Sequence, residues 1–230
     1  MSKIIEFTNV LGLDLFPPKP AIKAIPDWYK DTPEYIEQLG RKYDKEGHTS
    51  ATIKKCIPVL DAISSGYILY TQVDVQITQE NGFPYYVWPS LQPIAFHPLE
   101  QAPLHPKKTE SPYPKWNNPY AIKTPPGYST LFLPPMHNPN KIFTILEGLV
   151  DTDKYTAPVN FPFILNDVKW EGIIEAGTPM AQVIPVKRDS WEHKIGSQKE
   201  REEQNMVTIN LRTTFFNSYK KKFWSRKEYK

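Results

Sequence analysis

Proline is spread along almost the whole chain, and no other feature constrains the fold more strongly. The sequence holds 24 prolines among its 230 residues, roughly twice the usual share. Proline has no backbone N–H and a fixed φ, so it is costly inside helices and in central strands. The chain is therefore expected to fold into many short elements joined by stiff, extended loops.

The stretch YILYTQVDVQITQENGFPYYVWP carries the clearest β signal. Apolar or β-branched residues alternate with polar ones from Thr71 to Thr78, and this period of two predicts a strand with one buried and one polar face. The Asn-Gly pair at 81–82 is typical of a tight hairpin turn, with Phe83–Trp88 as the return strand. The polar face, which carries Asp74, fits either a solvated surface or the floor of a ligand groove.

Further strands are expected at intervals of about eight to fifteen residues, with Pro or Gly between them. They are Ile4–Phe7, Tyr120–Lys123, Tyr128–Leu133, Ile142–Val150, Phe161–Leu165, Gly172–Glu175 and Met180–Lys187. The segment from Pro89 to Pro119 is instead expected to be loop-like. A loop of that length inside a domain is usually functional or binds a partner.

Two short helices are expected in the first third of the chain. Pro33–Arg41 follows a capping residue and begins with proline, and Ile57–Ser65 has apolar residues at helical spacing before a glycine. Three aromatic residues are expected to anchor the Pro-rich N-terminal arm on the core. They are Trp28, Tyr29 and Tyr35.

Residues 198–230 differ in kind from the rest. They hold nine Lys and Arg against four Glu, a net charge of +5 in a chain whose total is +3, so the remainder carries about −2. Apolar residues from Val207 to Phe223 recur at roughly helical spacing, with acids before them and lysines after, which predicts a basic amphipathic helix. A strand at Met206–Leu211 is the alternative, because β-branched residues are frequent there.

Together these patterns predict a mainly β protein, a double-sheet sandwich with jelly-roll-like architecture and short helices. Three parts are expected: a Pro-rich arm with a short helix packed on the core at 1–50, the β-sandwich core at 51–197, and the basic amphipathic C-terminal segment at 198–230.

Cys56 is the single cysteine, so no internal disulfide and no thiolate metal cluster can form. It is expected to be a small buried residue, with a nucleophile at a helix N-terminus as the alternative. The N-terminus lacks a secretory pattern, and no stretch is apolar over the ~18–20 residues that span a bilayer. We therefore expect a protein that is neither secreted nor membrane-spanning.

Histidines give a weak signal for a metal-dependent enzyme. None of the five is followed two residues later by an acid, and no His-x-His pair occurs, whereas iron oxygenases need two His and a carboxylate. The remaining metal candidates are His97, Glu100 and His137, with Glu147 as another carboxylate, in a cupin-type, oxygenase-like site. The alternative is that these are ordinary loop residues. Phosphate-binding glycine motifs are also absent, and no cofactor is expected apart from this metal ion.

The stretch GTPMAQVIPVKRDSW ends a predicted buried strand on charged residues. Gln182 would lie among apolar neighbours, where its amide needs partners. Arg188 and Trp191 can hold a carboxylate or stack a planar group, and a rim salt bridge is the simpler alternative. The candidate ligand-binding residues are Gln182, Arg188, Asp189, Trp191 and Tyr128.

The tail SYKKKFWSRKEYK mixes bases with aromatics. This pattern is typical of phosphate binding and base stacking, and it also suits a helix that anchors on a neighbouring subunit. The nucleic-acid candidates are Lys220, Lys221, Lys222 and Arg226. Nucleic acid is a less favoured partner, because the rest of the chain is mildly acidic.

Five stretches in one order carry a resemblance: IPDWYKDTPEY, TIKKCIPVLDAISSGY, TPPGYSTLF, VNFPFIL and IEAGTPMAQVIPVKRDSW. The chain resembles a family of functionally uncharacterised proteins found in tailed bacteriophages, including marine T4-like phages, and in some bacteria. The resemblance covers most of residues 1–195 and implies a mainly β fold in a host cytoplasm or a virion. It carries no catalytic residues. The strand GTPMAQVIP is also similar to the G-x-x-x-A-Q strand of dUTPase-like proteins, but the acidic and serine motifs expected there are missing.

These observations favour a non-enzymatic phage accessory or virion-associated protein that acts through protein–protein binding, as a homo-oligomer or with another protein. Long segments rich in proline and aromatics suit such a role, because stiff segments lose little entropy on binding. The alternatives are the metal-dependent oxygenase-like enzyme and, more weakly, nucleic-acid binding through the basic tail.

Overall fold

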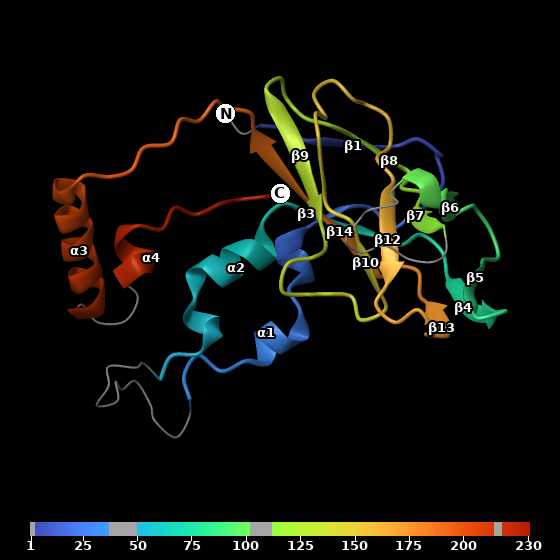
Figure 1. Ribbon diagram of the computed structural model, residues 1–230, viewed down its shortest axis with the longest axis horizontal. Helices are drawn as coiled ribbons and strands as arrows, with labels where there is room; N and C mark the ends of the chain where they lie inside the picture. Colours follow the sequence, from blue (N-terminus) through green and yellow to red (C-terminus); the bar gives the residue numbers. More distant parts are fainter. Residues whose placement is uncertain (1–2, 37–49, 102–111, 214–217) are drawn as a thin grey trace. The chain divides into compact units, whose positions relative to one another are not determined.

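The computed structural model describes residues 3–36, 50–101, 112–213 and 218–230 (Figure 1). Contacts group the chain into two units. The first, here called the β unit, comprises Met1–Ala24, Ile63–Arg188 and Tyr229–Lys230, and the second, the helical unit, comprises Ile25–Ala62 and Asp189–Glu228. Contacts thus group residues 25–62 with 189–228, whereas the division expected from the sequence had boundaries at 50 and 197.

The β unit contains fourteen strands within the described residues. They are β1 (Glu6–Asn9), β2 (Lys19–Pro20), β3 (Tyr67–Tyr70), β4 (Val75–Glu80), β5 (Phe83–Val87), β6 (Ile94–His97), β7 (Tyr113–Trp116), β8 (Tyr120–Lys123), β9 (Tyr128–Leu133), β10 (Phe143–Ile145), β11 (Gly148–Val150), β12 (Phe161–Leu165), β13 (Gly172–Ile174) and β14 (Pro179–Lys187). Two short 3₁₀ turns, η1 (Ala21–Ala24) and η3 (Leu99–Gln101), complete it. The predicted mainly β class is confirmed.

The strands form antiparallel sheets of five, four, three and two strands. Their orders are β11-β9-β14-β3-β2, β10-β12-β7-β6, β13-β4-β5 and β1-β8. Buried side chains from all four sheets meet in one apolar cluster. The fold is therefore a β-sandwich whose faces share a single core.

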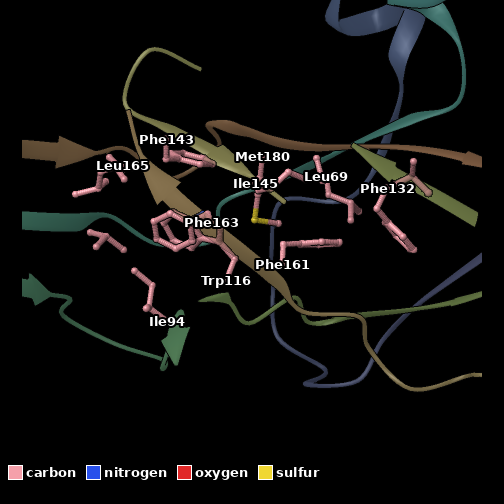
Figure 2. Close-up of a cluster of buried hydrophobic side chains, with 14 of the residues drawn as sticks. Leu69, Ile94, Trp116, Phe132, Phe143, Ile145, Phe161, Phe163, Leu165 and Met180 are labelled. Carbon is pink, nitrogen blue, oxygen red and sulfur yellow. The ribbon is translucent and has the colours of Figure 1, made fainter. Parts of the chain in front are cut away.

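Aromatic rings fill the centre of this core (Figure 2). The rings of Trp116 and Phe163 stack with centroids 4.9 Å apart, and Phe143 meets both at 5.2 and 5.5 Å. Rings of this size bury large apolar areas and gain further from offset and edge contacts. The four-stranded sheet contributes most of these rings, so its register positions the centre of the sandwich.

The strand β14 is central, because it pairs with β9 on one edge and with β3 on the other. Its residues from Met180 to Val183 are buried on both faces. This explains why the sequence of the strand reads as a continuous apolar run. Arg188 follows directly after the strand, where its N–H bonds the Gly127 carbonyl at 2.9 Å.

The predicted hairpin is confirmed in β4 and β5. Asn81 and Gly82 both have positive φ, 52° and 81°, as the two-residue turn of a hairpin requires. The strand β4 starts at Val75, later than predicted from the sequence. Its faces agree with the prediction, because Val75 and Ile77 are buried and Gln76 is exposed.

Two sequence expectations for strands are wrong. The single strand expected at Ile142–Val150 is split into β10 and β11, which belong to different sheets. The segment expected to be a loop between Pro89 and Pro119 contains β6 and β7, whose pairing with each other and with β12 outweighs the proline signal. The prolines at 93 and 98 lie just outside β6, where they interrupt no pairing.

The helical unit contains α1 (Asp27–Asp31), η2 (Ile53–Lys55), α3 (Gln198–Thr213) and α4 (Ser218–Lys222), and α2 (Ile57–Ser64) runs from it into the β unit. The predicted helix at 57–65 is confirmed, and the tail is helical rather than a strand at 206–211. The helix predicted at Pro33–Arg41 is wrong over 33–36, because Tyr35 bridges Ala51 in extended pairing. The rest of that range lies outside the described residues.

The helical unit contains all three expected anchors, Trp28, Tyr29 and Tyr35. Tyr29 is buried and Trp28 is exposed at 41%, and the Tyr29 hydroxyl donates to the Lys54 carbonyl at 3.3 Å. The tail is held to α2, since the Trp224 Nε1 and the Lys227 Nζ both donate to the Asp61 carboxylate. No described helix is both long and apolar enough to cross a membrane.

Candidate functional site

The β unit has a pocket of about 290 Å³ beside Trp116. Its wall comes from the loop after β1, the β3 end, the loop before β6, the turn after β7 and β14. The lining residues are Val10, Leu11, Tyr70, Thr71, Gln72, Val73, Leu91, Gln92, Pro93, Trp116, Asn117, Asn118, Pro119 and Met180. None of them carries a charge, so the pocket is apolar with an amide and hydroxyl rim.

Backbone geometry at the rim is fixed by Asn117. Its N–H donates to the Pro93 carbonyl at 2.7 Å and its side-chain Nδ2 to the Gln92 carbonyl at 2.8 Å. Leu91, just before, has a φ of 58°, which is rare for a branched side chain and persists only where neighbouring contacts enforce it. The rim is therefore held in one conformation.

Two other polar side chains of the pocket, Gln72 and Thr71, also have protein partners. The Gln72 Nε2 donates to the Tyr70 carbonyl at 2.7 Å, and its Oε1 accepts from the Phe16 N–H at 2.8 Å. The Thr71 hydroxyl donates to the Glu175 carbonyl at 2.8 Å. These side chains therefore use their hydrogen-bonding groups to connect loops of the protein.

Trp116 is the exception in this wall. It is 2% exposed, and its Nε1 is the one buried side-chain nitrogen or oxygen without a hydrogen-bond partner in the described part of the chain. Buried indole N–H groups normally find an acceptor. An unpaired donor in the wall of an apolar pocket marks the place where an acceptor is missing.

Gln182 lies at the centre of β14 and is fully buried. Its Oε1 accepts from the Met136 N–H at 2.8 Å, and its Nε2 donates to the Ser65 carbonyl at 2.7 Å. The amide thus joins two loops on opposite sides of the strand, and it does not line the pocket beside Trp116.

Arg188 is engaged by acids at the end of β14. Its Nη1 and Nη2 bind the two oxygens of Asp153, and its Nη1 lies 3.1 Å from an oxygen of Asp151. The same Nη1 donates to the Tyr128 carbonyl at 3.1 Å and to the Ser129 hydroxyl at 3.2 Å. This geometry matches the rim salt bridge that the sequence left open as the simpler alternative.

The charged groups of this cluster shift one another's pKa values. The bond from Arg188 lowers the pKa of Asp153 to about 2, against the desolvation of this carboxyl, with help from the Gly127 N–H. The bond from the Ser129 hydroxyl is the main cause that lowers the pKa of Asp151. Asp153 raises the pKa of Arg188 through the same bond. The cluster is therefore ionised throughout the physiological range.

The remaining ligand candidates, Tyr128, Asp189 and Trp191, belong to two different units. Tyr128 is in the β unit, where its hydroxyl accepts from the Lys3 Nζ. Asp189 and Trp191 belong to the helical unit, and Trp191 is 88% exposed.

The metal candidates do not converge. His97 ends β6 and its Nδ1 contacts the Gln101 Oε1, Glu100 lies in η3, and His137 has a φ of 56° in the loop after β9. Among the described residues, which include these three and Glu147, no group of three or more His, Cys, Asp or Glu side chains is placed to hold a metal ion. The hypothesis of a metal site at His97, Glu100 and His137 therefore gains no support from the described residues.

The basic tail is exposed and partly used within the helical unit. The Lys220 Nζ lies 5.8 Å from the centroid of the Trp224 ring, and Arg226 pairs with Glu228 at 3.2 Å. Lys221 and Lys222 are exposed.

Lys220 also lines a second pocket, of about 330 Å³, in the helical unit. The other lining residues are Ile25, Tyr29, Lys30, Glu34, Lys54, Lys55, Ile57 and Leu60. Two of its lysines have acidic partners, at 2.8 Å for Lys30 with Asp27 and at 3.1 Å for Lys55 with Glu34. The Lys54 Nζ donates to two carbonyls of α1. Acidic partners thus compensate two of the four lysines that line this pocket.

The outer face of the sheet β13-β4-β5 is apolar and exposed. Register aligns Ile173 with Gln76 and Gln76 with Val87, so these side chains share a face. The same face carries Tyr85 and Phe83, and the exposed fractions of the four apolar side chains are 44–55%. β4 adds Gln76, Thr78 and Glu80 to this face, and of these three only Glu80 is charged. We call this surface the outer β5 face.

The pocket and the outer β5 face were both missed at the level of sequence. Trp116 lies in the segment expected to be a loop, although the run YPKW before Asn-Asn-Pro is a short strand followed by a turn signal. The alternation of Phe83, Tyr85 and Val87 was recognised as a strand, but not as an outward apolar face.

Comparisons with known proteins add little. No family model matches the sequence, and no curated protein matches it. Among solved structures, the chain is similar to a mutant dUTPase from phage phi11 of S. aureus. The identity is 14% and the TM-score 0.33, over 59% of this chain and 85% of that chain. No activity is taken from so distant a likeness.

Proposed function

We propose that this protein is a non-enzymatic, phage-associated accessory or virion protein that acts through protein–protein binding, with the outer β5 face as its contact surface and a second copy of the chain as its first partner. The single observation that carries the proposal is the outer β5 face itself. Single exposed apolar side chains are normal, but several that adjoin on one sheet face mark an interaction surface.

The character of the face favours contact through side chains. β5 is the last strand of its sheet, and such an edge can accept another strand through its backbone. However, Pro84 lies within β5 and has no N–H, which makes the strand a poor template for addition. A partner would therefore cover the face rather than extend the edge.

A second copy fits this surface well. A two-fold interface brings the same patch of both subunits together, so the patch has to be self-complementary. Since Glu80 is the one charge among the named residues of the face, two copies can meet with little repulsion. The two copies of Tyr85 and Phe83 would supply rigid aromatic contacts of the kind that dominate interfaces.

Other observations support a binding role over an enzymatic one. The described residues include no group of three or more His, Cys, Asp or Glu side chains placed to hold a metal ion, and Arg188 is occupied by Asp153. The sequence resemblance to bacteriophage proteins is the support for a phage-associated role, in a host cytoplasm or a virion.

The test is sedimentation velocity of the purified chain over a wide range of concentrations. The wild type is expected to self-associate, and Val87→Glu and Ile173→Glu are expected to be monomeric at concentrations where the wild type is not. Leu149→Glu is the matched control, because Leu149 is an even more exposed apolar residue, at 62%, on β11 in another sheet. A wild type that stays monomeric, or face variants that associate like the control, would refute the proposal. Circular dichroism confirms that each variant is folded.

A further inference from the structure

We infer that the pocket beside Trp116 binds a small, neutral, planar ring compound, which accepts a hydrogen bond from the Trp116 indole N–H. This site is separate from the outer β5 face, and none of the residues that line it belongs to that face. Four features of the pocket define the ligand: its volume, its lack of charge, the unpaired donor and one adaptable side chain.

The volume sets the size of the ligand. The pocket holds about 290 Å³, which is at the lower end for small-molecule sites. Liquid water takes about 30 Å³ per molecule, so the space corresponds to a compound of about ten non-hydrogen atoms. A fused two-ring compound fits this size.

The lining sets the charge. No Asp, Glu, Lys, Arg or His contributes to the wall. An ion that entered this pocket would lose water without gaining a countercharge, which is strongly unfavourable. The apolar side chains of Leu91, Pro93 and Val73, together with the Trp116 ring, favour a flat apolar body instead.

The hydrogen-bonding balance sets the polar group. The amides of Asn117 and Gln72 and the hydroxyl of Thr71 bond protein groups. Trp116 remains as a donor without an acceptor. Indole nitrogen is a donor only, so the complementary ligand presents an acceptor, such as a ring nitrogen or a carbonyl oxygen.

Met180 supplies access to the donor. The Trp116 Nε1 is covered in this structure, so a lining side chain has to move before a ligand reaches it. Met180 lines the pocket, is 3% exposed and lies in the same core cluster as Trp116 (Figure 2). Methionine has three rotatable bonds and fills irregular gaps, so we expect Met180 to be the side chain that moves when the ligand binds.

Three probes of nearly equal size test each requirement. Quinoline is neutral in mildly alkaline buffer and has one acceptor nitrogen. Naphthalene lacks the acceptor, and N-methylquinolinium is a permanent cation. Binding is followed by ¹H–¹⁵N NMR of the indole N–H groups, since the chain has six tryptophans and the Trp116 signal is assigned by its loss in Trp116→Phe.

Quinoline is expected to move the Trp116 indole signal and the Met180 methyl signal saturably, with naphthalene weaker and N-methylquinolinium without effect. In Trp116→Phe, quinoline is expected to bind about three- to tenfold more weakly, as for the loss of one hydrogen bond, while naphthalene binds as in the wild type. The inference is overturned if quinoline moves no signal of the pocket, if the cation binds as well as quinoline, or if Trp116→Phe leaves quinoline binding unchanged.

Two further variants keep the test open if Trp116→Phe does not fold. Val10→Trp changes a side chain at the pocket that is 51% exposed, and it is expected to block quinoline by filling the mouth. Met180→Leu keeps the volume but stiffens the side chain. It is expected to weaken quinoline binding by more, in free energy, than it lowers the stability of the fold. Quinoline binding that persists unchanged in both variants would place the compound elsewhere and overturn the inference.

Discussion

Gln182 offers the sharpest test of how the sandwich is held together, because its amide is a structural cross-link and not a ligand site in our account. The substitution Gln182→Leu keeps the approximate size of the side chain and removes both hydrogen bonds. It leaves the Met136 N–H and the Ser65 carbonyl without the partners that now lie at 2.8 and 2.7 Å.

The size of the effect follows from these two groups. A buried donor or acceptor left unsatisfied costs about 1–3 kcal/mol, so the pair costs about 2–6 kcal/mol, and the added apolar burial of leucine offsets about 1–2 kcal/mol of this. We expect the free energy of unfolding to fall by about 1–4 kcal/mol. For a chain of this length that corresponds to a drop in Tm of about 2–16 °C.

The assay is urea unfolding followed by the near-ultraviolet circular dichroism of the core aromatics, which reports on the β unit. Lys123→Leu is the control, because Lys123 is exposed on β8, outside the outer β5 face, and its change is expected within about 0.5 kcal/mol. A Gln182→Leu variant as stable as this control would refute the cross-link, and the search for a ligand of Gln182 would then resume.

Three further predictions concern acid stability, packing and backbone geometry. The bond from Arg188 is the chief reason that the pKa of Asp153 lies at about 2 instead of 3.8. Asp153 therefore stabilises the fold above a pH of about 4, and this contribution is lost as the pH falls towards about 2. Asp153→Asn should flatten the acid side of a plot of urea midpoint against pH, and an unchanged slope would contradict this. Phe163→Ala, which empties the middle of the aromatic cluster, should lower the free energy of unfolding by about 3–5 kcal/mol, measured by the same urea titration. Gly66→Ala should destabilise the fold by more than about 1 kcal/mol, since Gly66 has a φ of +71° and a Cβ there would lie 2.0 Å from the Val183 carbonyl oxygen. A variant as stable as the wild type would contradict this steric argument.

Much of the fold could be predicted from residue patterns, because the signals for the later strands are local. β8, β9 and β12 have the predicted bounds, and each is an apolar or alternating run between turn residues. The Asn81-Gly82 turn was equally clear, since positive φ at both positions restricts the residues that fit.

The errors arose where distant pairing decided the structure. β7 contains a proline and lies in a proline-rich segment, yet Trp116 is among the most buried residues, because β12 and β6 flank the strand. Pro33 has good helix-start neighbours, but Tyr35 pairs with Ala51 instead. Neither partner strand can be identified from the local sequence.

The candidate sites were less predictable than the fold, for a related reason. Arg188 was recognised from the charges at a strand end, but its partner Asp153 comes from a loop 35 residues earlier. The pocket beside Trp116 combines five separate segments, and its distinguishing feature is a hydrogen bond that is missing. A local sequence pattern does not indicate that a buried donor will lack a hydrogen-bond acceptor.

The central claim is that this protein works by covering the outer β5 face with a partner, and hydrogen–deuterium exchange at low and high protein concentration tests it most directly. We predict that amides of β5 and β13 become more protected as the concentration rises, while those of β11 do not change. Equal exchange in β5 at both concentrations, or protection that appears at β11 instead, would contradict the account.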